Sequence, residues 1–204
     1  MGSNAPGRRL VALGSFLAAL LPGAADATVV LALDLDAKLA RSDAVVHGVV
    51  EDVQARRPGG DGPIETTVQI RVLEAFRGPA RPQDRFSLQR AGGTVAGVTE
   101  WIPGLHRYRP GDEVVVFAER AGAGWVAVGV GIGTYVIERP PGCEPGASDC
   151  GWAQFRPNVA QAGPDGRVAA VPPSAVPWPV FRDRLARPEA FAPTPNPSPA
   201  PRAK

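Results

Sequence analysis

Hydrophobic and polar residues alternate most regularly between residues 66 and 76. Within this run Val68, Ile70 and Val72 are separated by polar side chains, which is the two-residue period of a β-strand with one face in water. The β-branched residues favour a strand, and the turn sequence Gly78-Pro79 ends it. We therefore predict a strand over residues 66–76 at the centre of the fold.

Four other runs have patterns that indicate partner strands: residues 44–53, 85–89, 112–119 and 125–137. The first is almost continuously apolar around Gly48, so it suits a strand buried on both faces, and its pairing register is the least determined. We expect the following side chains to be largely buried: Val46, Val50, Val68, Ile70, Val72, Val114 and Val116.

Two short helices are predicted at the ends of this region. Leu31, Leu35 and Leu39 recur every four residues and Asp34 can cap a helix, so we predict a short helix over residues 34–40. Residues 178–186 can form a final helical turn or two. We expect the first helix to pack its leucine face against the sheet.

The composition favours strands and loops over long helices. The chain of 204 residues contains 24 glycines and 23 prolines, which interrupt most segments that could continue as a helix. We therefore predict a mainly β protein: a small OB-like β-barrel of five or six strands, with a short N-terminal helix and a loop-rich C-terminal extension. The net charge of +2 and the scattered arginines do not indicate nucleic-acid binding.

The amino-terminal residues have the order of an export signal. Arg8-Arg9 precede an apolar run over residues 10–21, and Ala25-Asp26-Ala27 follows as a small-x-small cleavage site. The run is shorter than the roughly 20 residues that span a bilayer, which disfavours a membrane anchor. We predict a signal peptide over residues 1–27, a mature chain that begins at Thr28, and a secreted or periplasmic location with no stable membrane span after cleavage.

The rest of the chain divides into three parts in this interpretation. We predict a β-barrel domain over residues 28–139, a disulfide-looped extension over residues 140–190 that packs on the barrel, and a disordered proline-rich tail over residues 191–204. Cys143 and Cys150 flank turn residues, and in an exported chain such a pair indicates one disulfide. A zinc half-site is the alternative, but the histidines are distant in sequence, so we predict no metal site.

Three segments together resemble a netrin-like (NTR) module, which has the OB-type barrel of the tissue inhibitors of metalloproteinases. They also resemble a set of uncharacterised secreted bacterial proteins. The matching residues are Ser42-Asp43, Val45-Val46, Gly48 and Val50, then Val68, Ile70, Val72 and Phe76-Arg77-Gly78, and then Tyr108, Pro110-Gly111, Val114 and Val116-Phe117.

The chain also departs from the netrin-like pattern. The basic residue before the turn glycine is usually lysine in these modules and is Arg77 here, and residues 28–142 lack their cysteine framework. In the metalloproteinase inhibitors an amino-terminal cysteine chelates the catalytic zinc, whereas the corresponding residue here is Thr28. The resemblance therefore implies the barrel without that inhibitory activity.

No familiar catalytic or cofactor-binding motif occurs in the chain, so we predict no catalytic residue and no cofactor. The longest irregular stretch, residues 92–110, contains the candidate binding residues Trp101, His106, Arg107 and Tyr108. Alternatively, Trp101, Ile102 and Leu105 form a plug that closes one end of the barrel. We predict an exported, non-enzymatic module that binds a protein or glycan. The alternative is a secreted hydrolase whose site is assembled from scattered residues.

Overall fold

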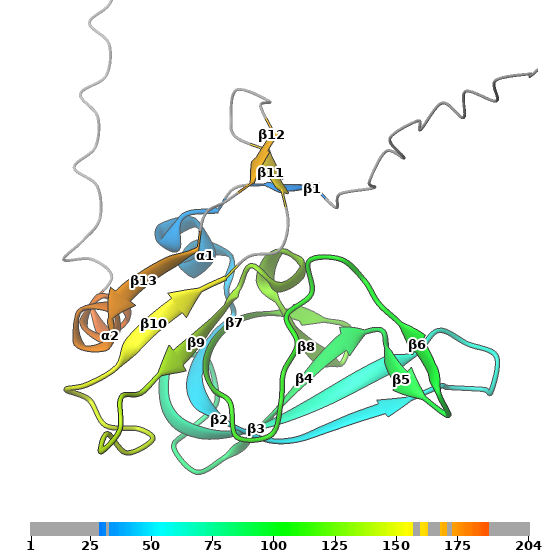
Figure 1. The fold of residues 1–204 in the computed structure, drawn as a ribbon, viewed down its shortest axis with the longest axis horizontal. Coiled ribbons are helices and arrows are strands. Elements are labelled where there is room, and N and C mark those ends of the chain that lie inside the picture. The colour runs from blue at the N-terminus through cyan, green and yellow to red at the C-terminus, as the bar shows by residue number, and fades with distance from the viewer. Residues whose placement is uncertain (1–28, 32, 157–159, 163–167, 171–172, 188–204) are drawn as a thin grey trace, which may run out of the picture.

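The computed structural model describes residues 29–31, 33–156, 160–162, 168–170 and 173–187. The predicted signal peptide and the predicted tail lie outside the described residues. The described chain is mainly β, as predicted, with an eight-stranded mixed sheet and two α-helices (Figure 1). None of the helices among these residues has the length and apolar character needed to cross a membrane.

The sheet is built outward from two long neighbouring strands. The order across it is β13-β10-β9-β7-β2-β3-β4-β8. Its strands are β2 (Ala44–Arg56), β3 (Glu65–Arg77), β4 (Arg85–Ala91), β7 (Glu113–Ala121), β8 (Gly124–Ala127), β9 (Thr134–Glu138), β10 (Trp152–Phe155) and β13 (Ser174–Pro177). A separate small sheet joins β1 (Val29–Leu31), β11 (Ala160–Ala162) and β12 (Val168–Ala170).

Strand β8 brings the two halves of the central sheet together. It pairs antiparallel with β7 from Ala118↔Ala127 to Ala121↔Gly124, and parallel with β4 at the single pair Leu88↔Trp125. Since β7 also pairs with β2, the strands β2, β3, β4, β8 and β7 form a ring of pairings. The β4–β8 side of this ring is held by much less backbone pairing than the others.

Four of the five predicted strands are confirmed, as β2, β3, β4 and β7. The seven side chains expected in the core are each at most 1% exposed. The pairing between β2 and β3 shifts register at three places, between Val45 and Val46, His47 and Gly48, and Val50 and Asp52. The apolar run that lacked a clean alternation is therefore the irregular strand of the pair.

The prediction of one strand over residues 125–137 is wrong. Two strands, β8 and β9, lie along the same side of β7, and the 3-10 turn η1 (Val128–Gly131) leaves the sheet between them. Gly129 and Val130 have φ of 63° and 58°, left-handed values that end a strand. Alternation in sequence does not reveal this break, because the valines on both sides keep the strand pattern.

The sheet has a hydrophobic cluster on each face. On one face Val46, Val68 and Val114 belong to a cluster formed by β2, β3, β4 and β7. On the other face, the aromatic residues Tyr135 and Trp178 belong to a cluster that includes both helices, α1 (Leu35–Arg41) and α2 (Trp178–Ala186). Burial on both faces explains why β2 is apolar at consecutive positions.

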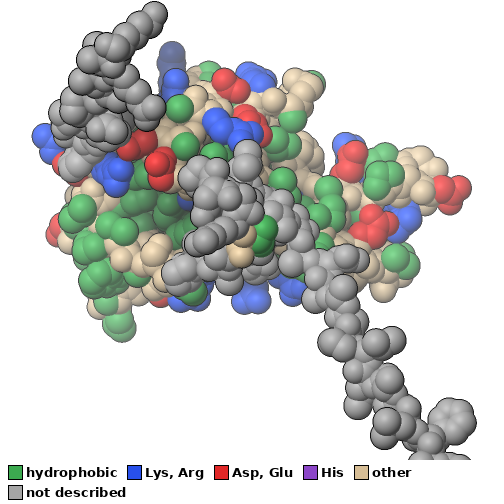
Figure 2. All heavy atoms as spheres, turned by 90° about the horizontal axis from the view of Figure 1, so that it is seen from above, with side chains coloured by type: hydrophobic (Ala, Val, Ile, Leu, Met, Phe, Trp, Pro, Cys, Tyr) green, Lys and Arg blue, Asp and Glu red, His purple; other side chains and the backbone are tan. Residues whose placement is uncertain are grey.

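Both predicted helices are confirmed. Asp34 caps α1, since its side chain accepts a hydrogen bond of 2.7 Å from the Ala37 amide. The second helix, α2, buries Trp178, Phe181 and Leu185 against the sheet. On the face drawn in Figure 2, positive and negative side chains are interspersed, and hydrophobic side chains gather at the left end, where α2, β10 and β13 lie.

Candidate binding site

The connection between β4 and β7 forms the candidate site. The predicted irregular stretch contains a short hairpin, β5 (Gly93–Val95) and β6 (Val98–Glu100). Its two-residue turn, Ala96-Gly97, has φ of 50° and 80°, as a hairpin turn of the primed types requires. The hydroxyls of Thr94 and Thr99 lie 2.9 Å apart across this hairpin. The hairpin gives residues 101–109 a fixed starting point.

Trp101 and Arg107 are stacked on each other at the surface. The guanidinium carbon of Arg107 lies 3.9 Å from the centroid of the Trp101 ring, and that of Arg90 lies 6.0 Å from it. Arg90 also donates a hydrogen bond of 2.9 Å from Nη1 to the carbonyl of His106. The stack therefore has a fixed geometry, with positive charge close to the aromatic ring.

Three arginines of this region have no acidic partner. Within the described part of the chain, Arg90, Arg107 and Arg109 form no ion pair, whereas many other arginines do, Arg71 and Arg182 among them. The Asp112 carboxylate is close in sequence, but it accepts a hydrogen bond of 2.8 Å from the Arg109 backbone amide. The exposed Arg107 and Arg109 and the half-buried Arg90 thus carry positive charge near Trp101 without an ion-pair partner, and the carboxylate of Asp112 is the acidic group that borders the same recess.

Two recesses flank Trp101, Arg107 and Arg109, which together we term the Trp101 rim. The first, of about 520 Å³, lies between the rim and strands β9 and β10, and Thr134, Gln154 and Arg156 contribute to its wall. We term this the arginine recess. The second, of about 440 Å³, lies between the rim and the β5–β6 hairpin. The rim is therefore a ridge that a ligand can contact from both sides.

The structure brings together three of the four predicted binding residues. Trp101 and His106 are half-buried at the recesses, and Arg107 is exposed. Tyr108 instead points into the core, where it is 7% exposed and its hydroxyl lies 2.7 Å from that of Thr134. Burial raises the pKa of Tyr108 to about 12. Tyr108 therefore anchors the loop from inside, and the other three candidate residues line the recess beside Trp101.

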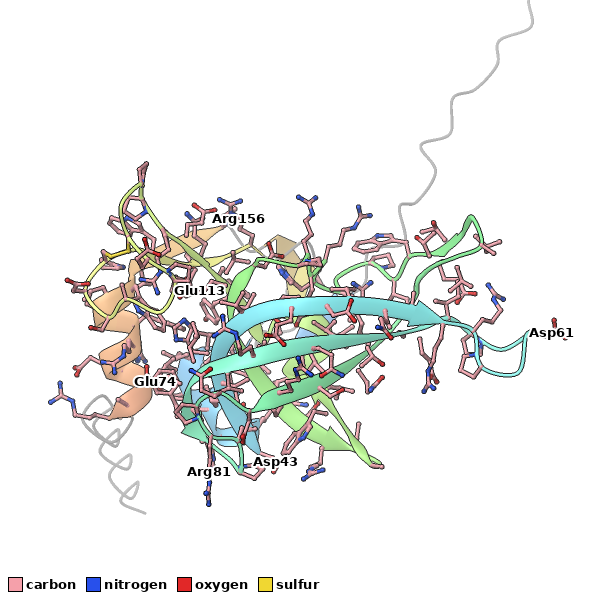
Figure 3. All side chains as sticks on the ribbon, turned by 90° about the horizontal axis from the view of Figure 1, so that it is seen from below. Asp43, Asp61, Glu74, Arg81, Glu113 and Arg156 are labelled. Atoms are coloured by element: carbon pink, nitrogen blue, oxygen red, sulfur yellow. A yellow bond between two sulfur atoms is a disulfide. The ribbon has the colours of Figure 1, made fainter. Side chains whose placement is uncertain are left out.

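The sequence did not reveal several residues of this site. Arg90 is at the end of β4, and Gln154 and Arg156 come from β10 and the residue after it, in the predicted extension. Arg156 lies at the surface in Figure 3, on the side of the molecule opposite Arg81. Nothing in the local sequence pairs these residues with Trp101, because sheet pairing between β9 and β10 brings them there. Arg109 lies within the predicted irregular stretch, residues 92–110, but was not one of the predicted candidate residues.

A second polar cluster lies inside the molecule. His47 Nε2 is 2.6 Å from Oε1 of Glu113, and Arg139 donates to both carboxylate oxygens of Glu113, with Nε at 2.9 Å from Oε2. The side chains of His47, Glu113 and Arg139 are 2%, 6% and 9% exposed. Because Arg139 donates to both oxygens of the Glu113 carboxylate, Glu113 is not available as a base for a substrate.

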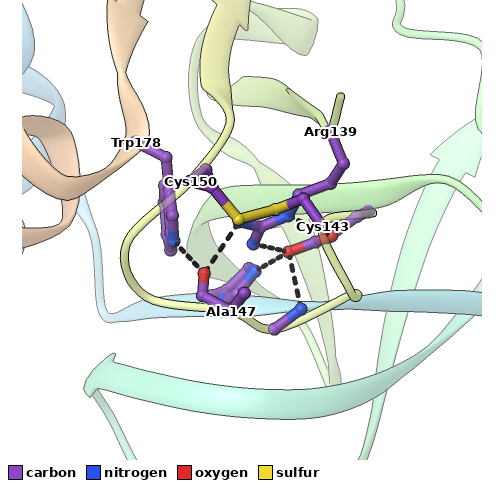
Figure 4. Close-up of a disulfide and its surroundings, with 8 residues drawn as sticks. Arg139, Cys143, Ala147, Cys150 and Trp178 are labelled. Atoms are coloured by element: carbon purple, nitrogen blue, oxygen red, sulfur yellow. Dashed lines mark hydrogen bonds and ion pairs between the residues drawn. A yellow bond between two sulfur atoms is a disulfide. The ribbon is translucent and has the colours of Figure 1, made fainter. Parts of the chain in front are cut away.

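The internal cluster connects the disulfide loop to the sheet (Figure 4). The predicted Cys143–Cys150 disulfide is confirmed, with the Cα atoms 6.3 Å apart. Arg139 donates to carbonyls of this loop, that of Ala147 at 2.7 Å and that of Cys150, and Trp178 Nε1 donates to the Ala147 carbonyl at 2.9 Å. The cluster thus holds the loop and α2 against β7.

The charge state of Glu113 follows from these contacts. Burial alone would raise the pKa of this carboxyl, but hydrogen bonds from Arg139 and His47 outweigh burial and lower the pKa to about 2. Glu113 is therefore ionised at neutral pH and balances the charge of Arg139. This arrangement serves structure in the way expected of a buried ion pair.

Neither site among the described residues has the donor set of a metal centre, since no group of three or more His, Cys, Asp and Glu side chains gathers there. Comparison with known proteins found no matching family model, no matching curated protein and no matching solved structure. The chemistry of the Trp101 rim and its recesses is therefore the guide to function.

Proposed function

We propose that this chain is an exported, non-enzymatic binding module that recognises an acidic segment of a partner protein through the Trp101 rim. One observation carries the proposal: the exposed Arg107 and Arg109 beside Trp101 form no ion pair among the described residues, although acidic residues pair with many of the other arginines. Unpaired, exposed guanidinium groups bind carboxylates well, because their planar donors match a carboxylate in two-point contacts.

A partner protein accounts for the rim better than a glycan does. Sugar rings stack on open aromatic faces, whereas one face of the Trp101 ring is already covered by Arg107 at 3.9 Å. The ridge and its recesses of about 520 and 440 Å³ suit an extended acidic segment that crosses the stack. A strongly acidic glycan is the competing ligand, and the experiment below distinguishes the two.

The framework of this module is proposed to be an OB-type barrel related to netrin-like modules. The ring of pairings through β2, β3, β4, β8 and β7 supports it, because an OB-fold is a five-stranded, partly open barrel. The loop that carries the rim joins two strands of this ring, as ligand-binding loops do in that fold. Export through a signal peptide over residues 1–27 is part of the proposal, and the disulfide is consistent with it.

The alternative hydrolase requires a base and a nucleophile that a substrate can reach. The His47–Glu113 pair is the one histidine–acid pair found in hydrogen-bond contact among the described residues, and its carboxylate is occupied by Arg139. At the recess, the half-buried His106 has no carboxylate within hydrogen-bond distance among these residues. The exposed chemistry is therefore that of charge recognition, which supports the binding proposal.

The test uses three fluorescent probes of matched length: an acidic peptide, an uncharged peptide and an acidic glycan. A decaglutamate peptide, a decaserine peptide and an oligoguluronate are each titrated with the purified chain at low salt. Saturable binding of decaglutamate, with weaker binding of the uronate and none of decaserine, is expected. If the uronate binds as tightly as decaglutamate or more tightly, the ligand is an acidic glycan and not a protein. If decaserine binds as tightly as decaglutamate, the proposal is contradicted.

A further inference from the structure

A third recess, separate from the two beside the rim, is almost entirely apolar. It has a volume of about 250 Å³ and lies between β4, β8, η1 and the loop after the hairpin. Its apolar wall is formed by Leu88, Ile102, Leu105, Val126, Ala127 and Val130. We term it the apolar cavity. It lies at the side of the ring where β4 and β8 share a single residue pair, so backbone pairing does not close the wall there.

The backbone at the mouth of this cavity is in an unfavourable conformation. Val130 has φ of 58°, a left-handed value that β-branched residues rarely adopt, and its side chain is 44% exposed. Gly131, next in the chain, packs against the backbone of the loop, where an added Cβ would lie 2.5 Å from the Gly104 carbonyl oxygen. The fold therefore holds an apolar side chain at the opening, in a conformation that its own packing does not explain.

Arg90 supplies positive charge to the wall. Burial lowers the pKa of its guanidinium, which remains charged at neutral pH. Arg90 donates to the carbonyl of His106 and, at 3.4 Å, to that of Ala91, and it has no acidic partner among the described residues. The other charged side chain of the wall, Glu119, pairs with Arg41 at 3.5 Å. A half-buried cation thus adjoins an apolar space.

We propose that the apolar cavity is a binding site for a small monocarboxylate whose apolar body is somewhat larger than benzene. An apolar cavity of about 150 Å³ is known to accept benzene, so 250 Å³ has room for a ring with a short side chain. Mainly apolar walls with a few polar or charged groups that fix orientation are typical of small-molecule sites. The carboxylate pairs with Arg90, and the body fills the space between Leu88 and Val130.

The test uses 3-phenylpropionate and two comparison probes. The first, 3-phenylpropan-1-ol, lacks the charge, and the second, propionate, lacks the apolar body. With the purified full chain, isothermal titration is expected to give saturable binding of 3-phenylpropionate with a Kd on the order of 0.1–1 mM. The alcohol should bind about tenfold more weakly because it lacks the Arg90 pair. In the amide NMR spectrum, shifts should concentrate at Leu105, Val126, Ala127 and Val130.

Two variants and one matched control complete the experiment. Arg90→Gln is expected to weaken 3-phenylpropionate about tenfold and to leave the alcohol unchanged, and Ala127→Leu, which fills the space, should remove binding of both. Arg85→Gln, on the same strand but paired with Glu51, should change neither. Equal affinity for acid and alcohol, or for acid and propionate, would overturn the assignment, as would the absence of saturable binding. Amide shifts elsewhere in the unmodified chain would overturn it even if a variant failed to fold.

Discussion

Arg107 lies over the Trp101 ring at 3.9 Å, and the same distance separates Arg120 from the ring of Trp125 at another place on the surface. The two stacks differ in their surroundings. The Trp101 stack forms the ridge between two recesses and has arginines without ion pairs beside it, whereas Arg120 lines neither of these recesses nor the apolar cavity. The Trp125–Arg120 stack therefore serves as a control. A ligand that recognises any arginine–tryptophan stack should respond to both stacks, whereas a ligand of the recesses should respond to the Trp101 stack alone.

Trp101→Ala should weaken binding of the decaglutamate probe by roughly tenfold while changing the thermal midpoint by only a few degrees. The ring is half-exposed, and its removal releases Arg107 from its fixed position without opening the core. Fluorescence anisotropy and thermal denaturation measure the two quantities. A large loss of thermal stability with unchanged affinity would show that Trp101 is only a plug.

Val130→Gly should stabilise the fold by about 0.5–1.5 kcal/mol in urea denaturation. A left-handed residue other than glycine costs about 1–2 kcal/mol, and the greater freedom of glycine in the unfolded chain offsets part of the gain. Val98→Gly is the matched control, because Val98 is similarly exposed but lies in strand β6, so this change should destabilise. If both changes destabilise equally, the φ of 58° at Val130 carries no strain.

Glu113→Gln should destabilise the fold by about 3–5 kcal/mol at pH 7, because it leaves the charge of Arg139 buried without its partner. The pKa of Glu113 is about 2 in the folded state, below its ordinary 4.5. The unfolded chain therefore takes up the proton first, and this stabilisation is lost as the pH falls from 4.5 towards 2. Urea denaturation of both proteins across this range should show their difference shrinking; a constant difference would argue against the assignment.

Lys38→Met should remove a rise in stability at alkaline pH. Lys38 is 1% exposed, and its Nζ donates to the Tyr135 hydroxyl at 3.0 Å and lies 3.9 Å from the centroid of the Phe155 ring. Burial lowers the pKa of Lys38 from 10.5 to about 8, although Asp34 opposes the shift.

The sign of this effect follows from the protons that each state binds. Between pH 8 and 10.5 the folded protein has lost the Lys38 proton and the unfolded chain keeps it, so stability rises with pH. The gain should be about 1–2 kcal/mol from pH 8 to 9.5, below the range where tyrosines titrate in the unfolded chain. Chemical denaturation at several pH values measures it, and an identical pH profile for Lys38→Met would contradict the explanation.

Much of the sheet was predictable because its signal is local. Alternating β-branched residues identify β3, and the buried run around Gly48 identifies β2. The break at Gly129-Val130 was not predictable, because it depends on two left-handed φ values that leave the hydrophobic pattern intact. The single pairing of Leu88 with Trp125 was equally invisible, since it joins strands that are distant in sequence.

The candidate site was predictable only in the part that one loop carries. Trp101 and Arg107 were selected because long loops with aromatic and arginine residues are often binding sites. Arg90 and Arg156 reach the same region from a strand and from the extension, so their positions follow from tertiary pairing. Tyr108 belongs to the same loop, yet its direction depends on the hydroxyl of Thr134, which sequence does not pair with it.

The most direct test of the account compares two double variants that remove the same charge. Decaglutamate affinity at low salt is measured for Arg107→Gln/Arg109→Gln and for the control Arg81→Gln/Arg120→Gln, whose arginines also have no ion pair among the described residues. We predict that the rim variant binds at least tenfold more weakly and the control less than twofold more weakly, with both folded. Equal losses in the two variants would show that the peptide follows net charge, and would contradict a site at the Trp101 rim.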